Sequence, residues 1–106
     1  MTHVIVEPGV CGLTADIRVN IVEMGQAEIE IDTKCKMIDE LAKSLGQPVD
    51  VYAVLGMSRG GPLLEQARMG KGIHAACPVV AGITKAVEAA AQMALPRNAS
   101  ITFVDD

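Results

Sequence analysis

The chain has 106 residues, of which 50% are hydrophobic, 2% aromatic and 21% charged, a balance typical of one globular domain over residues 1–106. Nine Lys and Arg against 13 Asp and Glu leave a net charge of −4, and the chain has no Trp, one Tyr and one Phe. It therefore lacks both the positive charge and the stacking side chains of a nucleic-acid-binding protein.

The first third of the sequence predicts a β-meander. Residues 3–7 are rich in β-branched side chains and end at Pro8-Gly9, which indicates a short strand followed by a turn. Residues 15–23 and 27–32 alternate between apolar and polar side chains on either side of Met24-Gly25-Gln26. This alternation predicts a β-hairpin with one apolar and one charged face.

The rest of the chain predicts helices with two further strands between and after them. Helices are expected over residues 34–45, 62–69 and 78–95, because their starts carry Asp, Thr or Pro and their ends carry Gly or Pro. Strands are expected over residues 49–55 and 100–104. We therefore expect an α+β fold in which the meander and later strands form one sheet, with about three helices packed on one face. A three-layer arrangement is the alternative.

No segment is predicted to enter or cross a membrane. The first residues, MTHVIVEPG, lack the basic start and apolar core of a signal peptide. The longest apolar stretch, residues 77–94, contains Thr84, Lys85, Glu88 and Gln92, and it predicts a buried helix rather than a membrane span. We therefore expect a cytoplasmic protein that binds neither membranes nor nucleic acid.

The last predicted helix carries a row of small residues spaced four apart, namely Gly82, Ala86, Ala90 and Ala94. Such a row lets another backbone approach closely, either from the sheet of the same chain or from a second subunit. Packing within one chain is the simpler interpretation. A homodimer, formed through this helix or through the edge of the sheet, is the alternative.

The three cysteines are the candidate chemical groups, and each lies at the end of a predicted element. Cys11 is in a loop beside Gly12, Cys35 is in the first turn of a helix, and Cys77 directly precedes Pro78. The cytoplasm keeps thiols reduced, so metal ligands or reactive thiols are expected rather than disulfides. The free amides and the dipole of a helix N-terminus also stabilise a thiolate, which favours such roles for Cys35 and Cys77.

A shared metal site is the function that these residues favour most. His74 lies three residues before Cys77, a spacing at which two side chains can bind one ion. With Cys11, Cys35 and Cys77 it would complete a tetrahedral zinc site, whereas the three thiolates alone could hold an iron–sulfur cluster with one open iron. The sequence has no CxxC pair, so this site depends on the fold. The simpler interpretations are a core position for Cys35 and a surface position for His74.

A reactive thiol is a second possible function. Cys77-Pro78 at a helix start is similar to the Cys-Pro motif of small sulfur-carrier proteins, although position 80 is Val80 rather than the second proline of that motif. Cys77 would then be the nucleophile, and Cys35 or Cys11 would resolve it as a disulfide. A structural or interaction protein, with the long apolar helix as an oligomer interface, is a third possibility.

A glycine-rich turn also matches a catalytic motif locally. Residues 56–60 are GMSRG, which fits the nucleophile elbow of serine hydrolases around Ser58. The only acid between Ser58 and His74 is Glu65, on the helix predicted to follow, so the usual order of the catalytic triad is missing. The same amides could instead hold a small anion, and a plain glycine turn is the simplest interpretation.

Four segments carry a resemblance to a known family: PGVCG at 8–12, HAACPV at 74–79, KAVE at 85–88 and ALPR at 94–97. They resemble a family of small uncharacterised proteins from anaerobic bacteria and archaea, over nearly the whole chain. The resemblance implies a cysteine-bearing α+β domain in an anaerobic setting, and it implies no particular activity.

Overall fold

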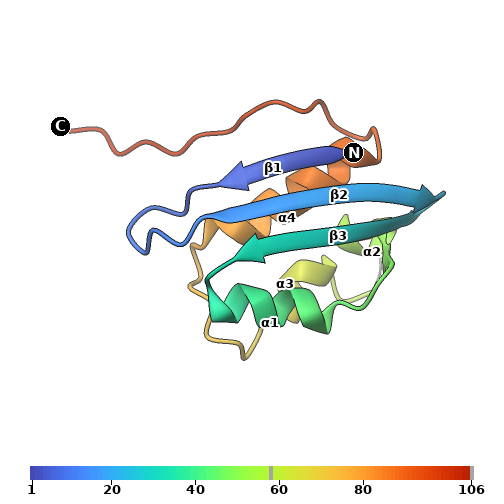
Figure 1. Cartoon of the computed structure of the whole chain (residues 1–106), viewed down its shortest axis with the longest axis horizontal. Coiled ribbons are helices and arrows are strands. Elements are labelled where there is room, and N and C mark those ends of the chain that lie inside the picture. Colours follow the sequence, from blue (N-terminus) through green and yellow to red (C-terminus); the bar gives the residue numbers. More distant parts are fainter. Residues whose placement is uncertain (58, 106) are drawn as a thin grey trace.

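The computed structural model describes residues 1–57 and 59–105. Within them, four antiparallel strands form one sheet in the order of the sequence: β1 (Thr2–Val6), β2 (Ala15–Glu23), β3 (Gln26–Thr33) and β4 (Val49–Asp50). The helices cover one face of this sheet (Figure 1). They are α1 (Lys36–Ser44), α2 (Val51–Val54), α3 (Leu63–Ala67) and α4 (Pro78–Ala90). The predicted α+β fold with an N-terminal meander is confirmed.

The alternation of side chains in the hairpin determines which face of the sheet is buried. Val19 in β2 pairs with Ile29 in β3, and both side chains lie in the core. Arg18 pairs with Glu30 one position away, and both are exposed on the opposite face. Full burial of a Val or Ile side chain is worth about 1.5–3 kcal/mol, so a register shift by one residue would be strongly unfavourable.

Helix α4 lies against β1 and β2 with its small residues facing the sheet. Gly82 and Ala86 are both buried. A Cβ atom on Gly82 would lie 2.3 Å from Cγ2 of Val6, closer than side-chain atoms can approach. A larger residue at this position would therefore force Val6 or the helix to shift, so the close packing favours glycine. Two members of the small-residue row, Gly82 and Ala86, therefore serve packing within the chain, whereas Ala94 is exposed and lies beyond the end of α4.

Helix α1 covers β3 through the buried side chains of Ile38 and Leu41. On its exposed side, Lys43 Nζ lies 2.9 Å from Asp39 Oδ2, one turn earlier. The hydrogen bond to Asp39 and the negative charge of that carboxylate raise the pKa of Lys43 above its ordinary value. Exposed ion pairs of this kind contribute little to stability.

The first half of the outer edge of β3 is covered in two ways. β4 pairs with it only at Gln26 and Ala27. Further along, the Ile29 N–H donates to Oε1 of Gln47, and Nε2 of Gln47 donates to the Ile29 carbonyl, each at 3.0 Å. One side-chain amide therefore satisfies the two backbone groups that another strand would otherwise pair with.

The segment after Gly46 differs from its prediction. Residues 49–55 predict one strand, but β4 ends at Asp50, whose carboxylate accepts a hydrogen bond from the Tyr52 N–H at 2.9 Å and caps α2. Val51 and Val54 are both buried because they share one face of this helical turn. A short apolar run fits a buried strand and a buried helical turn equally well, which explains the wrong prediction.

The C-terminal segment also differs. Helix α4 ends at Ala90 rather than near residue 95, and Gln92 adopts a left-handed conformation with φ of 60°. Residues 100–104, predicted as a strand, pair with no strand in the described part of the chain and are exposed to solvent. Within residues 1–57 and 59–105, every helix is too short or too polar to cross a lipid bilayer.

Candidate functional site

The three cysteine-bearing segments lie at the same end of the sheet. The end of β1, the start of β2 and the end of β3 are neighbours there, because the strand pairing aligns Val6, Ala15 and Thr33. Cys11 lies in the loop from β1 to β2, and Cys35 follows β3 directly before α1. Helix α4 begins at the same end, and Cys77 is its N-cap (Figure 1).

The cysteine side chains do not form a preassembled metal cluster. In the part of the chain that the structure describes, no group of three or more His, Cys, Asp or Glu residues could hold an ion. All three cysteines are free thiols, Cys11 exposed and Cys35 and Cys77 half-buried against the core. His74 is exposed. The fold thus brings the cysteine segments to one end without bringing their side chains into one group.

Cys35 and Cys77 occupy equivalent positions at the starts of α1 and α4. Each is an N-cap with extended backbone, and neither side chain makes a capping hydrogen bond to the described residues. The predicted start of α1 at residue 34 shifts to Lys36, because Thr33 Oγ1 accepts a hydrogen bond from the Cys35 N–H at 3.2 Å instead of capping the first turn. Both helices therefore offer first-turn amides to a sulfur at the N-cap.

Arg68 fixes the turn that leads into α4. The His74 carbonyl accepts one hydrogen bond from the Cys77 N–H at 3.0 Å and another from the Arg68 guanidinium at 2.5 Å. The Arg68 side chain is only 14% exposed, and its Nη1 lies 3.6 Å from Oε1 of Glu65. Sequence reasoning missed this residue, because the contact runs between a helix and a later loop and leaves no periodic signal.

The loop that carries Cys11 is held mainly by its own backbone. The Gly12 N–H donates to the Gly9 carbonyl at 2.9 Å, and both glycines have positive φ angles, 98° for Gly9 and 68° for Gly12. Apart from the glycine itself and its two chain neighbours, no described residue has an atom within 4 Å of the position that a Cβ would take on Gly9 or Gly12. Val10 is fully exposed beside them. This loop can therefore move without breaking core contacts.

The proposed nucleophile elbow lacks its structural context. Ser58 itself lies outside the described residues. The motif requires a strand directly before the turn, but residues 51–54 form α2 instead. Nothing in the described geometry therefore supports serine hydrolysis.

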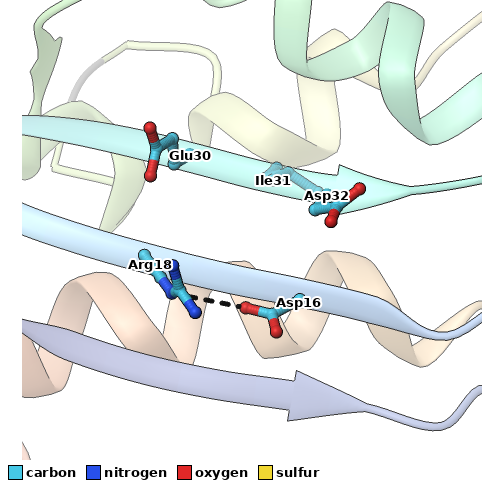
Figure 2. Close-up of a pocket in the computed structure, with 5 residues that line it drawn as sticks. All are labelled: Asp16, Arg18, Glu30, Ile31 and Asp32. Carbon is cyan, nitrogen blue, oxygen red and sulfur yellow. Dashed lines mark ion pairs between the residues drawn. The ribbon is translucent and has the colours of Figure 1, made fainter.

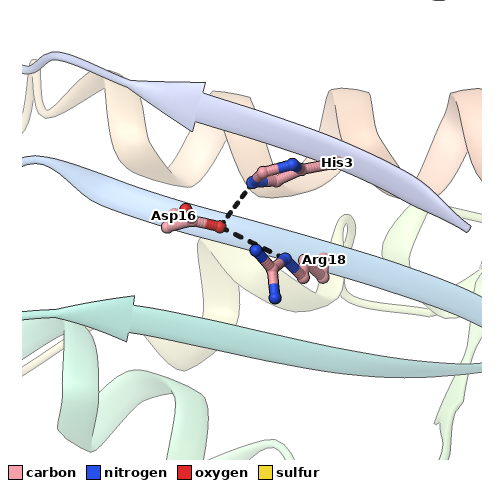
Figure 3. A network of polar contacts seen from close by, with 3 residues as sticks. All are labelled: His3, Asp16 and Arg18. Carbon is pink, nitrogen blue, oxygen red and sulfur yellow. Dashed lines mark hydrogen bonds and ion pairs between the residues drawn. The ribbon is translucent and has the colours of Figure 1, made fainter.

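The open face of the sheet, opposite the helices, carries charged side chains. A hollow on this face is lined by Asp16, Arg18, Glu30, Ile31 and Asp32 (Figure 2). Figure 3 shows His3 and Arg18 directed at the same carboxylate: His3 Nε2 lies 2.6 Å from Asp16 Oδ1, and Arg18 Nε lies 3.6 Å from it. These three residues come from two neighbouring strands.

The charges on this face balance one another only in part. Asp16 and Asp32 lie directly opposite in the pairing of β2 with β3, an arrangement that like charges disfavour. The contacts from His3 and Arg18 to Asp16 offset that repulsion. All of these side chains are substantially solvated, so the open face is an ionic surface rather than a built binding pocket.

Comparison with known proteins places the chain in a family. A model of the family described as "Family of unknown function (DUF6951)" matches residues 2–103, so the chain belongs to that family. No curated protein and no solved structure matches the chain. The family is defined without an activity, so the side chains and their placement are the only basis for a function.

Proposed function

We propose that this member of DUF6951 is a metal-binding protein that uses Cys11, Cys35 and Cys77 as thiolate ligands. The bound group is either zinc, with His74 as the fourth ligand, or an iron–sulfur cluster held by the three thiolates. The observation that carries the proposal is the convergence of the three cysteine-bearing segments on one end of the sheet.

The positions of the cysteines support an ordered route of assembly. Cys35 and Cys77 are already packed against the core at the starts of α1 and α4. Cys11 is exposed on a loop with no packing around its glycines, so this loop can close onto the other two thiols when metal binds. Metal binding commonly orders its ligands in this way.

The surroundings of the cysteines also suit thiolates. The uncapped first-turn amides of α1 and α4 can donate hydrogen bonds to ligand sulfurs, and the positive ends of both helix dipoles oppose the thiolate charge. Lys34 and Lys36 flank Cys35. We place the protein in a reducing, anaerobic cytoplasm, where thiols and iron–sulfur clusters persist.

Metal analysis of protein purified without oxygen tests the proposal. We expect stoichiometric zinc, or iron with the visible absorption of a cluster, in the unmodified chain, and loss of the metal in C11S, C35S and C77S. Met24→Ser is the matched control, because it removes an exposed sulfur side chain at the turn between β2 and β3. His74→Ala distinguishes the two forms, since only the zinc site uses the imidazole.

Loss of metal in these serine variants would not be caused by unfolding, because Cys11 is exposed on a loop and the other two cysteines are N-cap residues. Serine is among the best N-cap residues, so C35S and C77S keep or improve the capping of α1 and α4. A chain that takes up neither added zinc nor a reconstituted cluster would refute the proposal. Preferential alkylation or persulfide formation at Cys77 in such a metal-free chain would then favour the sulfur-carrier alternative.

A further inference from the structure

The two edges of the sheet are not equally protected. On the outer edge of β3, β4 covers Gln26 and Ala27, and the Gln47 amide covers Ile29. In residues 1–57 and 59–105, no strand pairs with the outer edge of β1. Natural proteins usually block such an edge with lysine, proline or a bulge, but β1 has the sequence THVIV and regular pairing with β2. The edge of β1 is therefore open to a further strand.

The C-terminal segment has the properties of a strand without a partner. Residues 100–104 are SITFV, which alternate in side-chain direction and are rich in β-formers. Ile101 is 88% exposed, Phe103 is 101% exposed and Val104 is 78% exposed. Exposure of three large apolar side chains on one short segment is unfavourable in water, and their burial would stabilise the chain.

The direction of the segment points to a second molecule. Figure 1 shows the red end of the chain running beside β1, past its end and away from the body of its own domain. To pair with the β1 of its own chain, the segment would have to turn back. A second copy offers the same open edge without that reversal, and each copy can give its segment to the other.

We propose that residues 100–104 pair with the outer edge of β1 in a second copy, and that the reciprocal exchange forms a closed dimer. In the added strand, Ile101 and Phe103 share one face, which would cover Val4 and Val6 at the half-buried margin of the core. Gly82 and Ala86 of the small-residue row are not free for this role, because both are buried and Gly82 packs on Val6. The dimer uses no cysteine, so it is independent of the proposed metal site.

Molar mass in solution tests the exchange. We expect the unmodified chain to have the mass of a dimer by size-exclusion chromatography with light scattering. The double variant T102P/F103P should have half that mass. Backbone N–H groups of successive strand residues point to opposite edges of the strand, so two adjacent prolines remove a hydrogen-bond donor from each edge. F103D should also be monomeric. Met24→Asp is the control at an exposed apolar position of the β2–β3 turn, and it should remain a dimer.

These variants leave the fold of each copy intact, since residues 100–104 pair with no strand in the described part of the chain. Hydrogen exchange locates the contact: the amides of β1 should exchange slowly in the dimer and faster in T102P/F103P. A monomeric unmodified chain would overturn the proposal, even if its β1 amides were protected by its own C-terminal segment. A dimer that persists in T102P/F103P would also overturn it, because another surface would then hold the copies together.

Discussion

Replacing Gly82 with alanine should destabilise the protein, although alanine is the better helix former. The new Cβ would lie 2.3 Å from Val6 Cγ2, whereas its distance to Ile17 Cδ1, 3.7 Å, is an ordinary contact. Carbon atoms pack at about 3.5–4.0 Å, so either Val6 or α4 must shift by more than about 1 Å. The strain therefore falls on a single contact between the helix and the end of β1.

The size of the effect follows from two opposing contributions. Overpacking a core contact costs about 1–3 kcal/mol, and this contact is at the severe end of that range. The replacement of glycine by alanine within a helix recovers about 1 kcal/mol. We expect G82A to lower the free energy of unfolding by about 1–2 kcal/mol, measured by urea denaturation followed by circular dichroism.

Two further variants make this prediction specific. Val6→Ala removes the methyl group that the new Cβ would meet, so adding G82A to V6A should cost nothing or should stabilise the chain. Ala81→Gly, at the exposed neighbouring position of α4, should cost about 1 kcal/mol through helix propensity alone. If G82A were as stable as the unmodified chain, the close approach of α4 to β1 would be wrong.

Three other predictions test separate parts of the structure. Gln47→Leu should cost about 1 kcal/mol and speed hydrogen exchange at the Ile29 amide, because the Ile29 backbone loses both amide partners. Cys77→Ser should raise the stability of the metal-free chain by up to about 1 kcal/mol, since serine caps α4 and cysteine does not; equal thermal midpoints would contradict this. Asp39→Asn should lower the pKa of Lys43, and NMR titration of the lysine would measure the change. Because that pKa is raised by folding, any stability from the pair is present below the ordinary lysine pKa and is lost as pH rises through the raised value.

The hairpin and the packing helices could be predicted because local patterns determine them. Ile17 and Val19 alternate with Arg18, and this alternation selects the buried face regardless of the rest of the chain. The short β4 and α2 could not be predicted, because the burial of Val51 and Val54 depends on where the chain lies against α4. Residues 100–104 have the composition of a strand, but composition does not supply a partner.

The candidate site was predictable in its parts and not in its assembly. Turn and capping signals placed Cys35 and Cys77 at helix starts; the structure confirms the position of Cys77 and moves Cys35 from the first turn to the N-cap of α1. Whether those ends meet depends on the register of three strands, which no single segment encodes. The contact of Arg68 with the His74 carbonyl depends on tertiary structure in the same way.

The amide of Gln47 also limits how far the sheet can grow. Reciprocal exchange at one edge closes into a finite dimer, whereas strand addition at both edges of a sheet can continue into filaments. Beyond Ala27, the Gln47 amide covers the Ile29 position of the β3 edge, so its replacement would expose the backbone groups of Ile29 to another strand, on the edge opposite β1. Turbidity and sedimentable mass at high concentration in Gln47 variants would report that change directly.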